Sequence, residues 1–172
     1  MRTPLFVAAV CLAAGTFAFA QTVTHDVDRS ADFSVIKTYQ WGHGMPVGDE
    51  LNDRRIVSAI ESELAAKGIT RAPAGTPADV VVAYYASFGQ ELEINGSGWG
   101  GYRLGGMRSG SAQVEEVLLG TLAVQMVNAR TGAVLWRAMA TREIDLKASP
   151  EKRDKNIRTA IEKMFKKYPR GH

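Results

Sequence analysis

The position of the only cysteine most constrains how this chain can fold. Cys11 lies among the first twenty residues, which carry a positive charge at the second position, an apolar run over 5–14 and Ala18-Phe19-Ala20 at their end. This arrangement is typical of a secretory signal peptide, and the apolar run is too short for a membrane-spanning helix. We expect cleavage after Ala20, which leaves a mature chain without cysteine.

The mature chain therefore has to fold on its hydrophobic core alone. Cleavage leaves 152 of the 172 residues, and a chain of roughly 150 residues buries about 68–70% of its unfolded surface. Disulfides, thiolate nucleophiles and cysteine-ligated metals are excluded. We expect a single domain over residues 21–172. The mature protein should be located in the periplasm or be secreted. Lipid anchoring through Cys11 is disfavoured, because the bulky Val10 stands where a lipoprotein signal has a small residue.

Charge excludes one large class of partner. The formal net charge of the whole sequence is only +3, which is too mild for a nucleic-acid-binding domain, and an export signal argues against such a partner independently.

Hydrophobic periodicity predicts an α+β fold. Period-two alternation and β-branched runs indicate strands, whereas apolar residues at three- and four-residue steps indicate helices. The predicted elements are strands near 22–27, 38–41 and 79–94, an antiparallel hairpin of 120–127 with 134–142, a helix over 50–67 with Asp49 as N-cap, and a helix that starts at Pro150 with Ser149 as N-cap.

These elements predict an antiparallel sheet of four to five strands, with the two amphipathic helices packed on one face. The apolar positions of the sheet and of both helices should meet in one core. The residues expected there are Leu122, Val124, Trp136, Ile60, Leu64, Ile161 and Phe165.

A glycine-rich segment at about 95–112 separates two of the strands and is expected to form a hairpin loop. Gly96-Ser97-Gly98-Trp99-Gly100-Gly101 matches the G-x-G-x-x-G pattern of dinucleotide-binding proteins. That function needs a helix directly after the glycines, and Tyr102-Arg103-Leu104-Gly105-Gly106 cannot start one. We therefore expect no nucleotide and no other cofactor.

The same segment carries the large side chains that anchor many binding surfaces. They are Trp99, Tyr102, Arg103, Met107 and Arg108. The pattern predicts that this loop contacts an envelope protein or a glycan, although a mobile hairpin tip without a partner has the same composition.

Carboxylates beside the loop suggest an alternative. Glu91 and Glu93 share one face of the predicted strand, and Glu115 is expected to lie across the hairpin. Paired carboxylates hydrolyse glycosides or bind Ca²⁺, but strand glutamates near a loop are more often a solvated face. The acidic segment 26–32 is interrupted by Arg29 and lacks the glycine of a Ca²⁺ loop, so no metal site is predicted.

The histidines give no constellation that could bind metal or activate a nucleophile. His25, His43 and His172 are far apart in the sequence, and none has a ligand-type neighbour at helical or hairpin spacing. We expect all three on the surface.

The C-terminal helix is strongly basic on its polar face. Its cationic residues are Lys152, Arg153, Lys155, Arg158, Lys163, Lys166, Lys167 and Arg170. Such a face is compatible with weak contact with an anionic membrane surface, although a basic face that is simply solvated has the same composition. The apolar stripe of the helix is needed to cover the sheet, so this contact would be electrostatic only.

The order of several sequence blocks resembles the domain of unknown function 4136 family (DUF4136), small bacterial envelope proteins often described as lipoproteins. The blocks are 31–34 with 37–41, 60–68, 78–82, 120–122, 131–137 and 160–169. The resemblance implies an α+β fold and an envelope location, and it brings no catalytic residues.

Together these features predict an exported, non-enzymatic binding or structural protein. The alternative is a cell-wall or glycan hydrolase that uses Glu91, Glu93 and Glu115.

Overall fold

A computed structural model describes residues 21–95 and 113–169 of the chain. Its elements, in chain order, are β1 (Thr22–Val27), the short 3₁₀ helix η1 (Phe33–Val35), β2 (Thr38–Trp41), α1 (Glu50–Ala66), β3 (Thr70–Arg71), β4 (Val80–Asn95), β5 (Gln113–Asn128), β6 (Val134–Glu143) and α2 (Pro150–Phe165).

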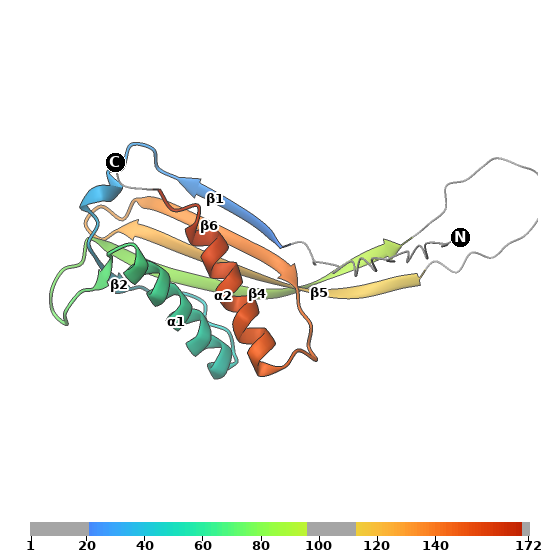
Figure 1. Cartoon of the computed structure of the whole chain (residues 1–172). Coiled ribbons are helices and arrows are strands. Elements are labelled where there is room, and N and C mark those ends of the chain that lie inside the picture. Colours follow the sequence, from blue (N-terminus) through green and yellow to red (C-terminus); the bar gives the residue numbers. More distant parts are fainter. Residues whose placement is uncertain (1–20, 96–112, 170–172) are drawn as a thin grey trace, which may run out of the picture.

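The strands form one six-stranded sheet in the order β1-β6-β5-β4-β2-β3, and α1 and α2 lie side by side on one of its faces (Figure 1). The prediction of two helices on one face is confirmed. The prediction of four to five antiparallel strands is wrong in part, because β2 runs parallel to β4 and β3 runs parallel to β2.

The parallel pairing follows from the connection that contains α1. The helix carries the chain back along the sheet before β4 begins, so β2 and β4 run in the same direction, as parallel neighbours joined by a crossover must. β3 is only two residues long, which is too short to show a hydrophobic period in the sequence.

Both helices begin as their capping residues predict. The Asp49 carboxylate accepts hydrogen bonds from the backbone N–H groups of Leu51 and Asn52, at 2.9 and 3.1 Å. The Ser149 hydroxyl accepts from Lys152 N at 3.3 Å, and Pro150 occupies the first turn. These bonds satisfy backbone donors that have no partner inside the helix.

The core lies between the helices and the central strands. Trp136 of β6 and Phe165 of α2 are fully buried, with ring centroids 5.1 Å apart. All the residues predicted for the core are there, with Leu122 half-buried at its margin. Burying such apolar surface supplies most of the stability of a chain without covalent cross-links.

The segment after β2 continues along the outer edge of β4. Gly42 N donates to Val82 O at 2.8 Å, and Met45 exchanges hydrogen bonds with Tyr84 and Ala86. A Cβ atom at Gly44 would overlap the carbonyl oxygen of Tyr84. Glycine is therefore needed there for the two backbones to approach, and the outer edge of β4 is covered as far as Ala86.

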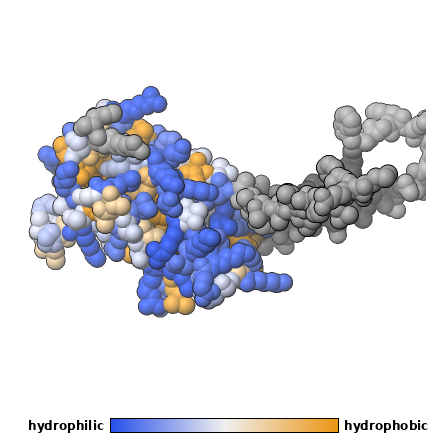
Figure 2. Space-filling model, viewed as in Figure 1, coloured by the Kyte–Doolittle hydropathy of each residue, from blue (hydrophilic) through white to orange (hydrophobic). Residues whose placement is uncertain are grey.

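Hydrophilic residues cover most of the face seen in Figure 2, with apolar residues in smaller patches. Among the helices that the structure describes, none is long and apolar enough to cross a membrane.

Candidate functional site

The hairpin of β4 and β5 projects past the rest of the sheet (Figure 1). The two strands pair along 16 residues each, from Val80↔Asn128 to Asn95↔Gln113. β6 follows β5 only to Leu119. We call residues 91–95 and 113–117 the arm. Within the described part of the chain, its two strands pair only with each other.

The glutamates singled out from the sequence all lie in this arm. Glu93 of β4 is directly opposite Glu115 of β5 in the strand register, and Glu91 is opposite Val117. The predicted placement across a hairpin therefore holds for Glu93 and Glu115 at the level of the backbone.

The predicted contact residues belong to the segment that joins the two strands of the arm. They are Trp99, Tyr102, Arg103, Met107 and Arg108, and they lie outside the described residues. The contact surface expected on this segment therefore stays a prediction.

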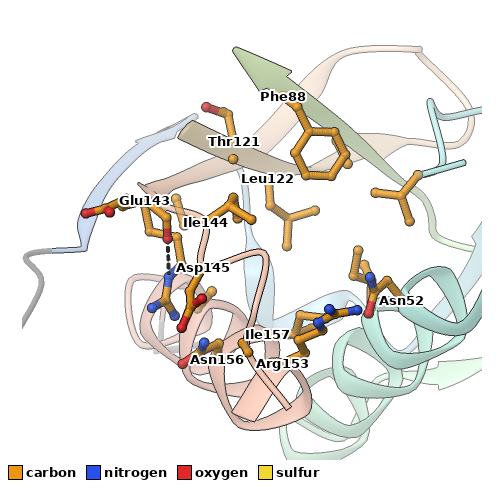
Figure 3. A pocket seen from close by; sticks show the side chains of 18 of the residues that line it. Asn52, Phe88, Thr121, Leu122, Glu143, Ile144, Asp145, Arg153, Asn156 and Ile157 are labelled. Atoms are coloured by element: carbon orange, nitrogen blue, oxygen red, sulfur yellow. Dashed lines mark hydrogen bonds between the residues drawn. The ribbon is translucent and has the colours of Figure 1, made fainter. Parts of the chain in front are cut away.

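A groove of about 330 Å³ lies where the N-terminal halves of α1 and α2 meet the helix-covered face of the sheet (Figure 3). Leu122 of β5 and Ile157 of α2 face each other across it, and Phe88 and Ile144 stand at its side. Phe88 is 59% exposed, so apolar surface continues from the groove to the outside.

Polar groups of the groove are gathered at its rim. Arg153 Nη2 donates to Leu146 O at 3.0 Å, and Arg142 Nε donates to Glu143 O at 3.3 Å. The Asp145 carboxylate is 2.8 Å from Lys152 Nζ, and the hydrogen bond from that ammonium holds the pKa of Asp145 below its usual value.

Sequence reasoning missed this groove because its lining comes from three strands and two helices far apart in the chain. One signal was present. Ala86 and Ala140 are small residues at helix-facing positions on either side of Leu122, where larger apolar side chains would have filled the space against the helices.

A second polar cluster joins α1 to the sheet. Glu61 Oε1 accepts hydrogen bonds from Tyr39 Oη at 3.2 Å and from Trp41 Nε1 at 3.1 Å. Burial and the neighbouring Glu61 carboxylate raise the pKa of Tyr39 to about 12. Asp53, earlier on the same helix, accepts from Tyr84 Oη. These contacts attach the helix to aromatic side chains of the sheet, and they occupy both carboxylates.

The acidic segment near β1 serves local turns. The carboxylates of Asp28 and Asp32 each accept hydrogen bonds from the serine two residues later, Ser30 and Ser34. These bonds lower the pKa of both aspartates. Over residues 21–95 and 113–169, no three His, Cys, Asp or Glu side chains lie together as a metal site.

The histidines are placed as expected where the structure describes them. His25 on β1 and His43 after β2 are exposed, and His172 lies outside the described residues.

The basic face of α2 is partly neutralised. Lys152 pairs with Asp145, Arg158 with Asp154 and Lys166 with Glu162, each at 2.8 Å. All three pairs are largely exposed, so each contributes little stability. They reduce the positive charge available to an anionic surface, and the membrane contact remains a prediction.

Solved structures of similar fold are known. A PDZ domain protein from Parabacteroides distasonis has a TM-score of 0.54 at 20% identity; the match covers 88% of this chain but only 37% of that protein. A DUF4136 family protein from Bacteroides thetaiotaomicron has a TM-score of 0.54 at 15% identity, covering 87% of this chain and 96% of that protein. The PelC dodecamer from Paraburkholderia phytofirmans has a TM-score of 0.50 at 17% identity, and the match covers 84% of this chain and 94% of that protein.

At these identities the likeness extends to the fold alone. The comparison with curated proteins gave no match. The family model of DUF4136, a domain of unknown function, matches residues 23–170, which is nearly the whole chain and includes almost every residue of the elements described above. The chain therefore belongs to the DUF4136 family.

Proposed function

We propose that this protein is a non-enzymatic binding protein of the bacterial envelope, with the arm and the glycine-rich loop that it carries as its contact surface. The observation that carries the proposal is the projection of the arm. A two-stranded ribbon is at best marginally stable in water by itself, and its outer edges offer unpaired backbone groups. A protein partner would satisfy both.

The composition of the arm defines the partner further. Its ten residues include Glu91, Glu93, Glu115 and Glu116 and contain no lysine or arginine. Two like charges opposite each other on paired strands, as at Glu93 and Glu115, destabilise the pair. Contact with a basic surface would relieve this repulsion, so the partner should be basic where it meets the arm.

Two further findings support a binding role in the envelope. The PelC protein with a similar fold forms a dodecamer, so this architecture is compatible with assembly into a larger complex. The first twenty residues have the pattern of an export signal, which directs the chain to the periplasm or the outside.

The test is a chain without the arm. Residues 90–118 are replaced by Asn-Gly, which favours the tight turn between Gly89 and Leu119, a directly opposite pair of β4 and β5. Tagged wild-type and arm-less chains are expressed in the native envelope, crosslinked, and their captured partners quantified by mass spectrometry. We expect capture to fall at least tenfold without the arm, and capture by the wild-type chain to weaken as the salt concentration rises, because salt screens the contact between acidic and basic surfaces.

The melting temperature controls for misfolding. The arm pairs with no third strand among the described residues, so its removal should shift the melting temperature by less than about 3 °C, the shift that ~1 kcal/mol gives in a chain of this size. Unchanged capture by a folded arm-less chain would refute the proposal.

One observation favours a second candidate. Residues directly opposite on antiparallel strands have Cβ atoms about 4.5–5.5 Å apart, so two glutamates at such positions can bring their carboxyl groups to the separation of about 5–5.5 Å found in retaining glycosidases. Glu93 and Glu115 occupy such positions. If the protein were such a hydrolase, Glu93→Gln would abolish release of reducing ends from purified cell wall, whereas a binding protein would show no release with either the wild type or the variant.

A further inference from the structure

The groove between the two helices and the sheet has the size and lining of a small-molecule site. Its volume of about 330 Å³ falls at the lower end of the roughly 300–1,000 Å³ found for ligand pockets, which are mostly apolar with a few polar groups. Hydrocarbon side chains such as Val47, Ile56, Leu122 and Ile157 dominate its walls, and polar side chains lie at its rim (Figure 3).

The backbone of the groove does not favour an extended peptide as occupant. A bound peptide needs partners for its own N–H and C=O groups. The strand positions that line the groove include Ala86, Leu122 and Ala140, and all three lie in paired stretches of β4, β5 and β6. Leu122 and Ala140 are paired within the sheet, and the N–H group of Ala86 donates to Met45 O at 3.0 Å. An occupant that needs no backbone hydrogen bonds from the sheet suits this groove, and an alkyl chain has that property.

The volume sets the length of that chain. A methylene group takes about the space of a water molecule, ~30 Å³, so a groove of about 330 Å³ accommodates roughly ten carbon atoms. The lining contains a single aromatic ring, Phe88, and is otherwise aliphatic or polar, which suits a flexible chain better than a flat ring.

The rim supplies a cationic contact for a polar head. Arg153 lies beside Asn52 where α1 and α2 meet (Figure 3). It uses Nη2 for the carbonyl of Leu146, and within the described part of the chain it forms no ion pair, whereas the nearby Asp145 is neutralised by Lys152. An arginine fork binds a carboxylate through two parallel hydrogen bonds.

We propose that this groove binds a medium-chain fatty carboxylate, with the alkyl chain between Leu122 and Ile157 and the carboxylate at Arg153. The site is separate from the arm, and the inference does not depend on the proposed function. Leu146, 70% exposed beside the groove, would be shielded from water by the bound chain.

Chain length provides the sharpest test. Each methylene buried strengthens binding about fourfold, so the affinity of the purified exported chain for octanoate, nonanoate and decanoate should rise by about that factor at each step and level off between about ten and twelve carbons. Isothermal titration calorimetry below the micelle concentration gives these affinities. Absence of binding, or a rise that continues well past twelve carbons, would overturn the proposal.

Two variants locate the site. Ala86→Leu places a larger side chain in the groove and should weaken decanoate binding at least tenfold. Ala123→Leu makes the same change on the opposite face of the sheet, where the register puts Ala123 beside Tyr85, and should leave binding unchanged. Equal effects of the two variants would contradict the assignment.

The head contact is tested with Arg153→Gln. This variant should weaken decanoate binding about tenfold and leave the binding of decanol, which has no charge, unchanged. An equal loss for both ligands would show that Arg153 only supports the fold.

Two controls distinguish ligand binding in the groove from the role of the arm and from dimer formation. The arm-less chain should bind decanoate as the wild type does. The proposal for the groove and the proposal for the arm can therefore be refuted independently of each other. If light scattering shows a dimer that Ala86→Leu dissociates, a second copy occupies the groove and the fatty carboxylate is ruled out.

Discussion

Phe165 shows what single residues contribute to this cysteine-free core. It is fully buried and packs against Trp136 and Tyr168. Removing a buried aromatic ring loses its transfer free energy and leaves a cavity, because the surroundings relax only in part.

Phe165→Ala should therefore lower the free energy of unfolding by about 3–5 kcal/mol. Urea denaturation followed by circular dichroism measures the change. Phe165→Leu, which keeps most of the apolar volume, should cost clearly less. A loss under ~1 kcal/mol for the alanine variant would mean that α2 is peripheral to the core.

Asp79 is a residue whose role depends on its charge. Its carboxylate accepts from Lys37 N at 3.0 Å, and from Thr38 N and Oγ1 at 2.8 Å each, so it ties the start of β2 to the start of β4. These hydrogen bonds lower the pKa of Asp79 below its ordinary value of 3.8, and the bond from the backbone of Lys37 has the largest effect.

This lowered pKa predicts a contribution to acid stability. The folded state holds the proton more weakly than the unfolded state, so the stabilisation is complete above the unfolded pKa and is lost as the pH falls through the folded pKa. Asp79→Asn removes this titration. Chemical denaturation from about pH 5 to pH 2 should then show a shallower loss of stability for the variant than for the wild type; parallel curves would contradict the role.

At the scale of elements, α1 is held to the sheet by polar as well as apolar contacts. Glu61 accepts from both Tyr39 and Trp41, whose rings pack edge to face with centroids 5.9 Å apart. A partly buried donor that loses its partner costs about 1–3 kcal/mol.

Glu61→Ala should thus destabilise the protein by about 1–3 kcal/mol, measured by denaturant unfolding. Ser62→Ala, an exposed change at the next position of the same helix, is the matched control and should change stability by less than ~0.5 kcal/mol. Equal effects would show that the hydrogen bonds of Glu61 contribute nothing.

The elements that could be predicted from the sequence are those whose signals are local. The caps at Asp49 and Ser149 and the turn between β5 and β6 depend on neighbouring residues, and all are where they were expected. The parallel pairing of β2 with β4 could not be predicted, because it depends on where α1 returns the chain. The groove could not be predicted for the same reason: Ala86 and Ala140 come to flank Leu122 only after the strands pair.

At the scale of the whole molecule, the protein combines a body that holds the described core with an arm that extends past that body. β4 and β5 contribute Val82 and Val124 to the body and then continue past the end of the other strands (Figure 1). Within the described residues the two strands of the arm pair only with each other, so the length of this strand pair calls for a reason outside the body. Contact with a partner is the reason that we propose.

Photocrosslinking from single positions in the intact envelope tests this central claim most directly. A photoreactive amino acid is placed at Leu92, in the arm, or at Gln40, an exposed position of β2 in the body. If the arm is the contact surface, discrete crosslinked adducts form from position 92 and none, or far fewer, from position 40. Adducts of equal yield from both positions, or from position 40 alone, would contradict it.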